Sequence, residues 1–283
     1  MVKQYISVNN LIGMAILVWG LVFPPVSASE CSKTVNIGVV ADWPPLTVFD
    51  ELGPWGLDVD IAEMVFQHVA VCTTYIRLPS SARTFEEMSK GVIDVAVMVS
   101  YTKDREAYGD FSLPYRFERM RLFSLSPPTA LADLASLLKQ SKTIGLSIGS
   151  YYGEELDKLK QDPHYKDQFV SIASAQRRVE MLMKARVDFI VDDMITGNYF
   201  IKERGLDAAQ AWPYVVHDNQ VHFLLRKNVF SARLKSKIDE AILALKPKIE
   251  LLVASYQSNA SFGVSTVSNR FPSYQPLPLS NLN

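Results

Sequence analysis

The stretch VNIGVVADWPP, residues 35–45, decides the class of fold. Its β-branched run up to Val40 is typical of a buried strand, and the prolines after Trp43 predict a turn where the strand ends. Downstream of Asp58, a plausible N-cap, apolar residues recur at helical spacing over 61–69. A strand followed by a helix is the first step of an α/β fold.

The alternation of strands and helices continues and then starts again. The first unit is expected to hold strands 35–40, 73–77 and 92–98 with helices after Asp58 and over 85–88, and the second unit strands 143–146, 169–172 and 188–191 with helices from Ser150 and over 179–185. Strands joined by helices pair in parallel through right-handed crossovers. The sequence therefore predicts two α/β units, each with a parallel sheet.

Two extended stretches link these units. Residues 121–128 lead from the first unit to the second and residues 214–225 lead back, which predicts a two-lobed body with a double-strand hinge. A helical pattern over 232–254, interrupted at Pro247, should pack on the first lobe. The expected organisation is a signal peptide over 1–28, lobe one over 33–124 plus 217–256, lobe two over 125–216, and a loosely ordered tail over 257–283.

The N-terminus has the order of a secretory signal. Lys3 is followed by an apolar run over 11–23 and by small residues that end at Ala28. The run is shorter than the ~20 residues that span a bilayer, which favours a cleaved signal peptide over a membrane anchor. Glu30 stands directly before Cys31, where a lipid-anchored protein would need a small residue. We therefore expect export across the membrane with cleavage near Ala28.

The composition bounds the class of protein. Of 283 residues, 48% are hydrophobic and 21% are charged, which is enough to bury a core in one large domain or two smaller ones. The formal net charge is −1, and without Lys3 the remaining 28 basic and 30 acidic residues give −2. A nucleic-acid binder would show a basic excess or stripe, so we expect no nucleic-acid partner.

The chain contains two cysteines, Cys31 and Cys72, both in the part that is expected to be exported. Oxidising conditions let a disulfide persist there, and no third cysteine competes for either partner. Each cysteine lies close to the start of one of two strands that we expect to be neighbours. We predict a disulfide between them, and the alternative is two separate buried thiols.

Short motifs follow one another in a characteristic order. They are GLDVDIA at 56–62, GVIDV at 91–95, TKDR at 102–105, FSLPY at 111–115, IGLSIGS at 144–150 and RVDFIVDD at 186–193. Over Val35 to Tyr256 the chain resembles family 3 of the bacterial extracellular solute-binding proteins, which includes the periplasmic glutamine-binding and lysine/arginine/ornithine-binding proteins. The resemblance implies the type II periplasmic-binding-protein fold, with two α/β lobes joined by a double-strand hinge.

The resemblance also implies a site for an amino acid. A planar carboxylate is best held by a bidentate cation, and an ammonium group by an anion a few ångströms away. Arg105 matches the family's carboxylate-binding arginine, with Thr102 as its hydroxyl partner and Ser100 as a backbone or hydroxyl contact. Without the resemblance, a solvated surface charge would be the simpler interpretation of Arg105.

Three further contacts complete the expected site. Asp193 matches the family's ammonium-binding aspartate and is preferred to Asp192, although either could simply end a strand. Ser150, expected at the start of a helix, offers a hydroxyl and free backbone donors. Trp43 falls where the family stacks an aromatic ring on the ligand, with ordinary core packing as the alternative.

Two departures from the family pattern leave the ligand's side chain open. Leu57 replaces the aromatic residue usual after the glycine of its motif, so one wall of the side-chain slot is thinner. Val40 stands where several members carry an acidic residue, which Asp42 could replace only with a shifted loop.

These features favour a periplasmic solute-binding protein that closes around a small polar ligand, an amino acid in particular, and serves an ABC-type importer through a membrane permease. The alternatives are a free-standing sensor subunit for a membrane receptor and an enzyme similar to the cyclohexadienyl dehydratases. Such an enzyme needs a proton-transfer group in the cleft. The histidines form no pair and no metal spacing: His68, His164, His217 and His222. We expect a monomer with no catalytic residue, no metal and no cofactor.

Overall fold

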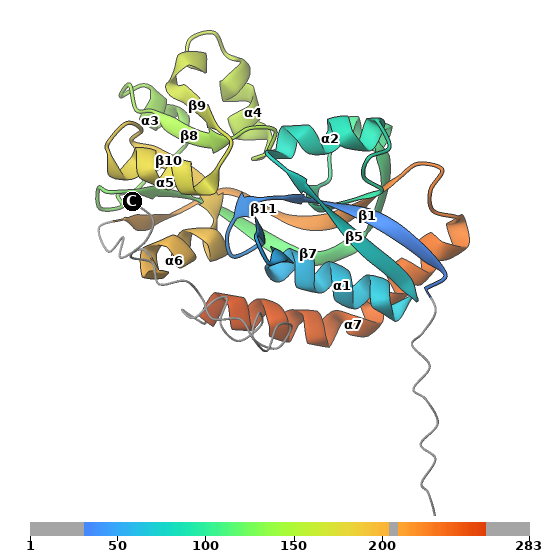
Figure 1. Cartoon of the computed structure of the whole chain (residues 1–283). Helices are drawn as coiled ribbons and strands as arrows, with labels where there is room; N and C mark the ends of the chain where they lie inside the picture. Colours follow the sequence, from blue (N-terminus) through green and yellow to red (C-terminus); the bar gives the residue numbers. More distant parts are fainter. Residues whose placement is uncertain (1–30, 204–208, 259–283) are drawn as a thin grey trace, which may run out of the picture. The chain divides into compact units, whose positions relative to one another are not determined.

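The structure, a computed structural model, describes residues 31–203 and 209–258 (Figure 1). The predicted signal peptide and nearly all of the predicted tail lie outside the described residues. Among the helices of the described ranges, none is both long and apolar enough to cross a membrane.

Eight strands form one mixed sheet in the order β5-β1-β6-β11-β7-β10-β8-β9. Its two parallel units are β1 (Lys33–Val40), β5 (Val71–Leu78) and β6 (Val95–Ser100), and β8 (Ile144–Ser147), β9 (Phe169–Ile172) and β10 (Phe189–Asp193). β1 pairs in parallel with both β5 and β6, and β8 pairs in parallel with both β9 and β10. We call these the first unit and the second unit, and both were expected from the sequence.

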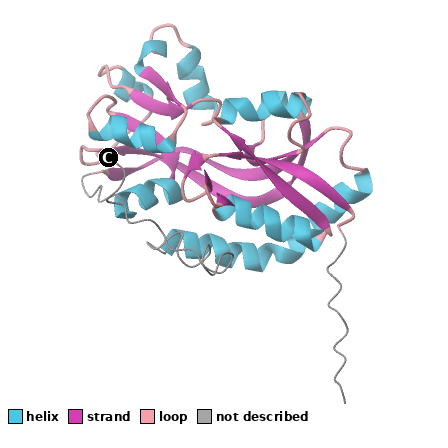
Figure 2. Cartoon of the chain, viewed as in Figure 1, coloured by secondary structure: helices cyan, strands magenta, loops and turns pink. Residues whose placement is uncertain are grey.

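Two long antiparallel strands, β7 (Gly109–Ser124) and β11 (Gln210–Arg226), connect the units (Figure 2). β11 pairs with β6 of the first unit, and β7 pairs with β10 of the second. This is the expected double-strand connection, but both strands begin earlier than predicted. The first part of β7 was not predicted, because it contains the charged residues Arg116 and Glu118, which would be expected to face solvent but are buried. The proposed lobe boundaries stay a prediction.

Helices cover both faces of the sheet (Figure 1). α1 packs against α7 on one face, and α2 lies on the other. The helices are α1 (Leu57–His68), α2 (Ser81–Ser89), α3 (Ala135–Leu138), α4 (Glu154–Gln161), α5 (Ala175–Met183), α6 (Met194–Glu203) and α7 (Ala232–Ser258), with 3-10 turns at Lys103–Ala107 and Lys166–Gln168. An unpredicted small sheet follows β1 and consists of β2 (Asp42–Trp43), β3 (Thr47–Asp50) and β4 (Gly53–Trp55).

Three local expectations were wrong. Gly56, and not Asp58, is the N-cap of α1; its φ of 126° suits glycine, and a Cβ there would lie 2.4 Å from the Leu46 carbonyl oxygen. α7 continues through Pro247, because the burial of apolar side chains on either side of it offsets the loss of one backbone hydrogen bond. The helix expected from Ser150 begins only at Glu154, after Gly153.

The predicted disulfide between Cys31 and Cys72 is confirmed. Their Cα atoms lie 5.5 Å apart, within the usual range for a bridge. The parallel register of β1 and β5 places Thr34 opposite Cys72, which brings the start of β1 beside the second cysteine. The bridge therefore ties the segment before β1 to β5, the strand at the edge of the sheet.

Candidate functional site

A cavity lies where β1, β6 and β8 end. About 580 Å³ between its walls is not filled by atoms, a figure that includes space open to solvent, and the centre of a water molecule can occupy about 50 Å³. Ligands of parallel α/β sheets bind in crevices outside the carboxyl ends of the strands. The lining residues are Gly38, Val40, Trp43, Thr47, Ser81, Thr84, Phe85, Val97, Met98, Val99, Ser100, Arg105, Glu118, Met120, Gly149, Ser150 and Tyr151. They come from β1 and β6, from β2 and β3 of the small sheet, from α2, from the 3-10 turn at Lys103–Ala107, from β7 and from the loop after β8.

Four of the six predicted ligand contacts line this cavity: Trp43, Ser100, Arg105 and Ser150. They come from segments far apart in the sequence, so the fold brings them together. Thr102 and Asp193 are not among the lining residues. Thr102 is the N-cap residue of the 3-10 turn that carries Arg105, and its backbone carbonyl oxygen accepts from the Arg105 N–H at 3.2 Å.

Arg105 is held in place by both units. Its Nη1 donates to the Ser100 carbonyl oxygen at 2.8 Å, and its Nη2 donates to the Gly149 carbonyl oxygen at 3.3 Å. The guanidinium also lies over the ring of Phe85, 4.9 Å from its centroid. Burial lowers the pKa of Arg105, and the nearby Glu118 opposes the shift. The two bonds use two of the five N–H donors and leave part of the planar fork for a carboxylate.

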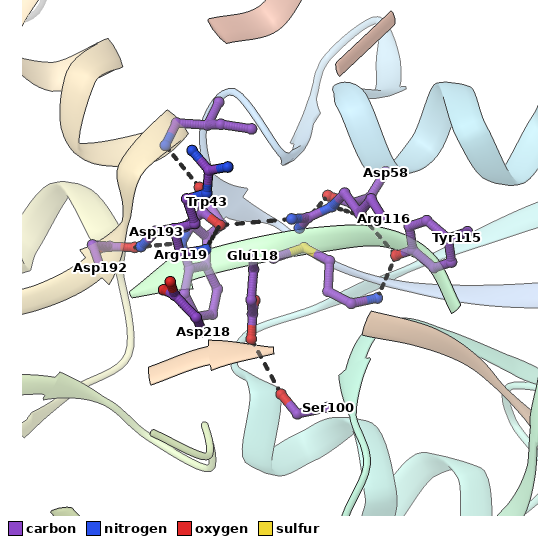
Figure 3. A network of polar contacts seen from close by, with 12 residues as sticks. Trp43, Asp58, Ser100, Tyr115, Arg116, Glu118, Arg119, Asp192, Asp193 and Asp218 are labelled. Carbon is purple, nitrogen blue, oxygen red and sulfur yellow. Dashed lines mark hydrogen bonds and ion pairs between the residues drawn. The ribbon is translucent and has the colours of Figure 1, made fainter. Parts of the chain in front are cut away.

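Glu118 is a functional candidate that the sequence interpretation missed. This β7 side chain is 3% exposed, and its Oε1 accepts a hydrogen bond of 3.2 Å from the Ser100 hydroxyl (Figure 3). Burial raises the pKa of Glu118 to about 8, with opposition from Arg116 and a further increase from Asp193. At neutral pH the cavity therefore contains a carboxyl group that is mostly protonated.

Arg116 and Asp58 form a buried ion pair that fixes β7 against α1 (Figure 3). The Nε and Nη2 atoms of Arg116 donate to the two carboxylate oxygens of Asp58 at 2.7 and 3.0 Å. The Tyr115 hydroxyl donates to the same carboxylate at 2.6 Å. This bidentate pair fixes the backbone that positions Glu118 two residues later.

The two adjacent aspartates at the end of β10 point to different partners. Asp193 accepts hydrogen bonds from the backbone N–H groups of Ile195 at 2.7 Å and Arg119 at 3.3 Å, and its Oδ2 lies 3.6 Å from the Nη1 of Arg116. Burial raises the pKa of Asp193, and Arg116 opposes that shift. The Asp193 carboxylate is thus bound by protein groups and does not line the cavity.

Asp192 is bound to Trp43. The indole Nε1 donates to its Oδ1 at 2.8 Å, while the Nη2 of Arg178 donates to its Oδ2 at 2.6 Å. Arg178 also lies 4.9 Å from the centroid of the Trp43 ring. The ring that lines the cavity is therefore positioned by the second unit. Thr47 lines the cavity too, and its buried hydroxyl has no hydrogen-bond partner among the described residues.

The histidines take no place in this site. None of the four lines the cavity. His217 packs edge-on against Tyr151 with ring centroids 5.2 Å apart, and burial lowers its pKa. Over residues 31–203 and 209–258, no group of histidine, cysteine and acidic side chains could hold a metal ion.

The sequence pattern of the bacterial extracellular solute-binding proteins, family 3, matches residues 35–251. No curated protein matches the chain. Among solved structures, a histidine kinase sensor domain with similarity to periplasmic binding proteins superposes with a TM-score of 0.68 at 20% identity, covering 81% of this chain and 97% of that one.

Two further solved structures are similar. The arginine-, lysine-, histidine-binding protein ArtJ from Geobacillus stearothermophilus has a TM-score of 0.66 at 19% identity and covers 83% of this chain and 100% of its own. An ancestral amino acid-binding protein, a precursor of cyclohexadienyl dehydratase, has a TM-score of 0.65 at 16% identity and covers 80% and 96%. At these identities the likeness concerns the fold, and the predicted type II periplasmic-binding-protein fold is confirmed.

Proposed function

The chain belongs to family 3 of the bacterial extracellular solute-binding proteins, and from this premise we propose that it binds a small polar ligand, an amino acid in particular, for an ABC-type importer. One observation carries the proposal: the partly free guanidinium fork of Arg105 lies in a cavity between the two units. A planar cation in a secluded site is suited to a carboxylate. The proposal places the protein in the periplasm, with a permease as its partner.

Neutral polar groups around Arg105 support a ligand with several hydrogen-bonding atoms. The hydroxyls of Ser100, Ser150 and Thr47 line the same cavity, and that of Thr47 is both fully buried and unpartnered among the described residues. A buried hydroxyl without a partner costs free energy unless a ligand or water satisfies it. Apolar walls from Trp43 and Phe85 would hold the ligand's carbon atoms.

Direct contacts between the two units support closure as the functional motion. The Ala82 N–H donates to the Ile148 carbonyl oxygen at 3.2 Å, and the hydroxyls of Ser150 and Ser81 lie 3.5 Å apart. With the Arg105 bond to Gly149, these contacts surround the cavity from both sides. A ligand held between Arg105 and the loop after β8 would favour the closed arrangement, with β7 and β11 as the hinge.

A thermal-shift screen of the twenty protein amino acids tests the proposal. A ligand present at 100 times its dissociation constant stabilises the folded state by ~2.7 kcal/mol, which is a measurable shift. At least one amino acid should raise the melting temperature, and small-angle scattering with it should give a smaller radius of gyration. If none of the twenty raises the melting temperature, the proposal fails. Sensing for a membrane receptor would rest on the same binding event.

One observation favours a second candidate, an enzyme similar to the cyclohexadienyl dehydratases. A mostly protonated carboxyl such as Glu118 is what a general acid requires. Prephenate and arogenate are the substrates to try, with formation of an aromatic product followed by ultraviolet absorbance. Turnover that is lost in Glu118→Gln would support the enzyme, and absence of turnover at high protein concentration would leave binding as the activity.

A further inference from the structure

We infer that Glu118 is the group in this cavity that receives the ligand's ammonium, and that it releases a proton to solvent as the ligand binds. The inference rests on the proposed function, since it assumes an amine-bearing carboxylate held by Arg105. It assigns to β7 a role that the sequence had given to Asp193 in β10.

The first argument is the position of the acidic side chains. Glu118 is the only carboxyl among the described residues that line the cavity. The nearby alternatives are occupied: Asp192 by the indole of Trp43 and by Arg178, and Asp193 by two backbone N–H groups. An ammonium removed from water needs a nearby anion. Glu118 is the acid in a position to supply it.

The second argument is that one oxygen of the Glu118 carboxyl has no hydrogen-bond partner within the described residues. Its Oε1 accepts from Ser100, and its Oε2 takes part in no hydrogen bond within the described residues. The charged groups that influence it are known: Arg116 on its own strand, Asp193 from β10, Asp58 from α1, and Arg105 across the cavity. Arg116 favours the ionised form of Glu118, but its guanidinium is paired with Asp58, and no hydrogen bond joins it to Glu118 within the described residues. An oxygen of a buried acid therefore remains for a ligand.

The third argument is charge balance. When Glu118 is protonated, the cavity has a net charge of +1, which Arg105 carries. A simple carboxylate neutralises this charge without any proton movement. An amino acid is a zwitterion, so its ammonium brings a second positive charge. The balanced step is Glu–COOH plus R–NH₃⁺ giving Glu–COO⁻ paired with R–NH₃⁺ plus H⁺ in solvent. The number of protons released thus distinguishes amine-bearing ligands from plain carboxylates.

The sign of the pH dependence follows from this step. Burial holds the pKa of Glu118 near 8 in the free protein, so below pH 8 only a minority of molecules have the ionised form that an ammonium requires. Affinity for an amino acid should therefore rise roughly fifty-fold from pH 6 to pH 8. A carboxylate without an amine should bind equally well at pH 6 and 7 and lose affinity above pH 8.

Calorimetry in buffers of different ionisation enthalpy tests the inference. The probes are the amino acid of the twenty-member panel that binds most tightly and the hydroxy acid with the same side chain. For the parent at pH 7, we expect release of close to one proton with the amino acid and none with the hydroxy acid. Glu118→Gln should abolish the proton release and the pH slope and weaken the amino acid more than tenfold at pH 8.

Glu155→Gln is the matched control, because it makes the same change at a carboxyl that binds Tyr214 and the Leu134 N–H outside the cavity. It should behave like the parent. Binding of the amino acid without proton release, or with the parent's affinity in Glu118→Gln, overturns the role of Glu118 and leaves the proposed function standing. If no amino acid binds the parent, both fail. The proton count needs only the parent, so it decides the matter even if Glu118→Gln does not fold.

Discussion

Replacing Glu118 by glutamine should stabilise the unliganded protein, and by an amount that grows with pH. The pKa of this carboxyl is about 8 in the folded chain, against 4.5 for an ordinary glutamate. A group whose pKa is raised on folding contributes its full stability below the lower value, and that contribution is lost as pH rises towards the higher one. The parent should therefore lose stability at this site between pH 4.5 and pH 8.

The size of the effect follows from the same two values. Each pH unit within that window is worth about 1.4 kcal/mol, so the site costs the parent about 3 kcal/mol at pH 7. Glutamine keeps an oxygen that can accept from the Ser100 hydroxyl, which is the one hydrogen bond of the Glu118 carboxyl group within the described residues. The variant should therefore avoid the cost of the buried acid without losing its contact.

Urea unfolding of both proteins at pH 5, 6, 7 and 8 measures the effect. All other titrating groups are shared, so the difference in unfolding free energy isolates Glu118. We expect the difference to grow by about 3 kcal/mol between pH 5 and pH 8 in favour of the variant. A difference that stays constant across this range would refute the reasoning, because it would mean that Glu118 titrates like an exposed glutamate.

Two more predictions concern the contacts that hold the site and the first unit. Trp43→Phe removes the indole hydrogen bond to the buried Asp192, so it should lower the unfolding free energy by about 2 kcal/mol and the melting temperature by about 4–8 °C. Trp55→Phe is the control, because it loses an exposed hydrogen bond to Asp50 and should change the melting temperature little. Equal shifts in the two variants would contradict this prediction. Replacing both Cys31 and Cys72 by serine opens a loop with a separation of 41 residues and should cost about 3–4 kcal/mol in chemical unfolding, and an unchanged midpoint would show that the bridge does not constrain the unfolded chain.

Much of the fold was predictable because its parallel strands are short runs rich in β-branched and apolar residues that alternate with helical patterns. β9 was predicted at its observed bounds, and the ends of β1 and β5 were predicted within a few residues. The start of β7 was not predictable, since burial of Arg116 and Glu118 depends on partners that come from other elements. Pattern recognition treats such charges as solvent-facing.

The site shows the same division. Arg105, Ser100, Trp43 and Ser150 could be predicted as candidates because each lies in or beside a local sequence motif. The cavity brings them together, and their contact with a ligand stays a prediction. Asp193, which the sequence interpretation preferred to Asp192, does not line the cavity, and neither does Asp192. Both carboxylates accept hydrogen bonds from protein groups that no local motif indicates. Glu118 had no motif, and only its burial beside Ser100 makes it conspicuous.

The most direct test of the binding function is calorimetry with the best amino acid of the panel on the parent, on Arg105→Lys and on Arg226→Lys. Lysine keeps the charge of Arg105 but loses the planar fork, so Arg105→Lys should weaken binding more than tenfold. Arg226 pairs with Asp94 at 2.6 Å outside the cavity, so Arg226→Lys should bind like the parent. If Arg105→Lys binds the amino acid as tightly as the parent does, no carboxylate is held by Arg105 and the account of this site is wrong.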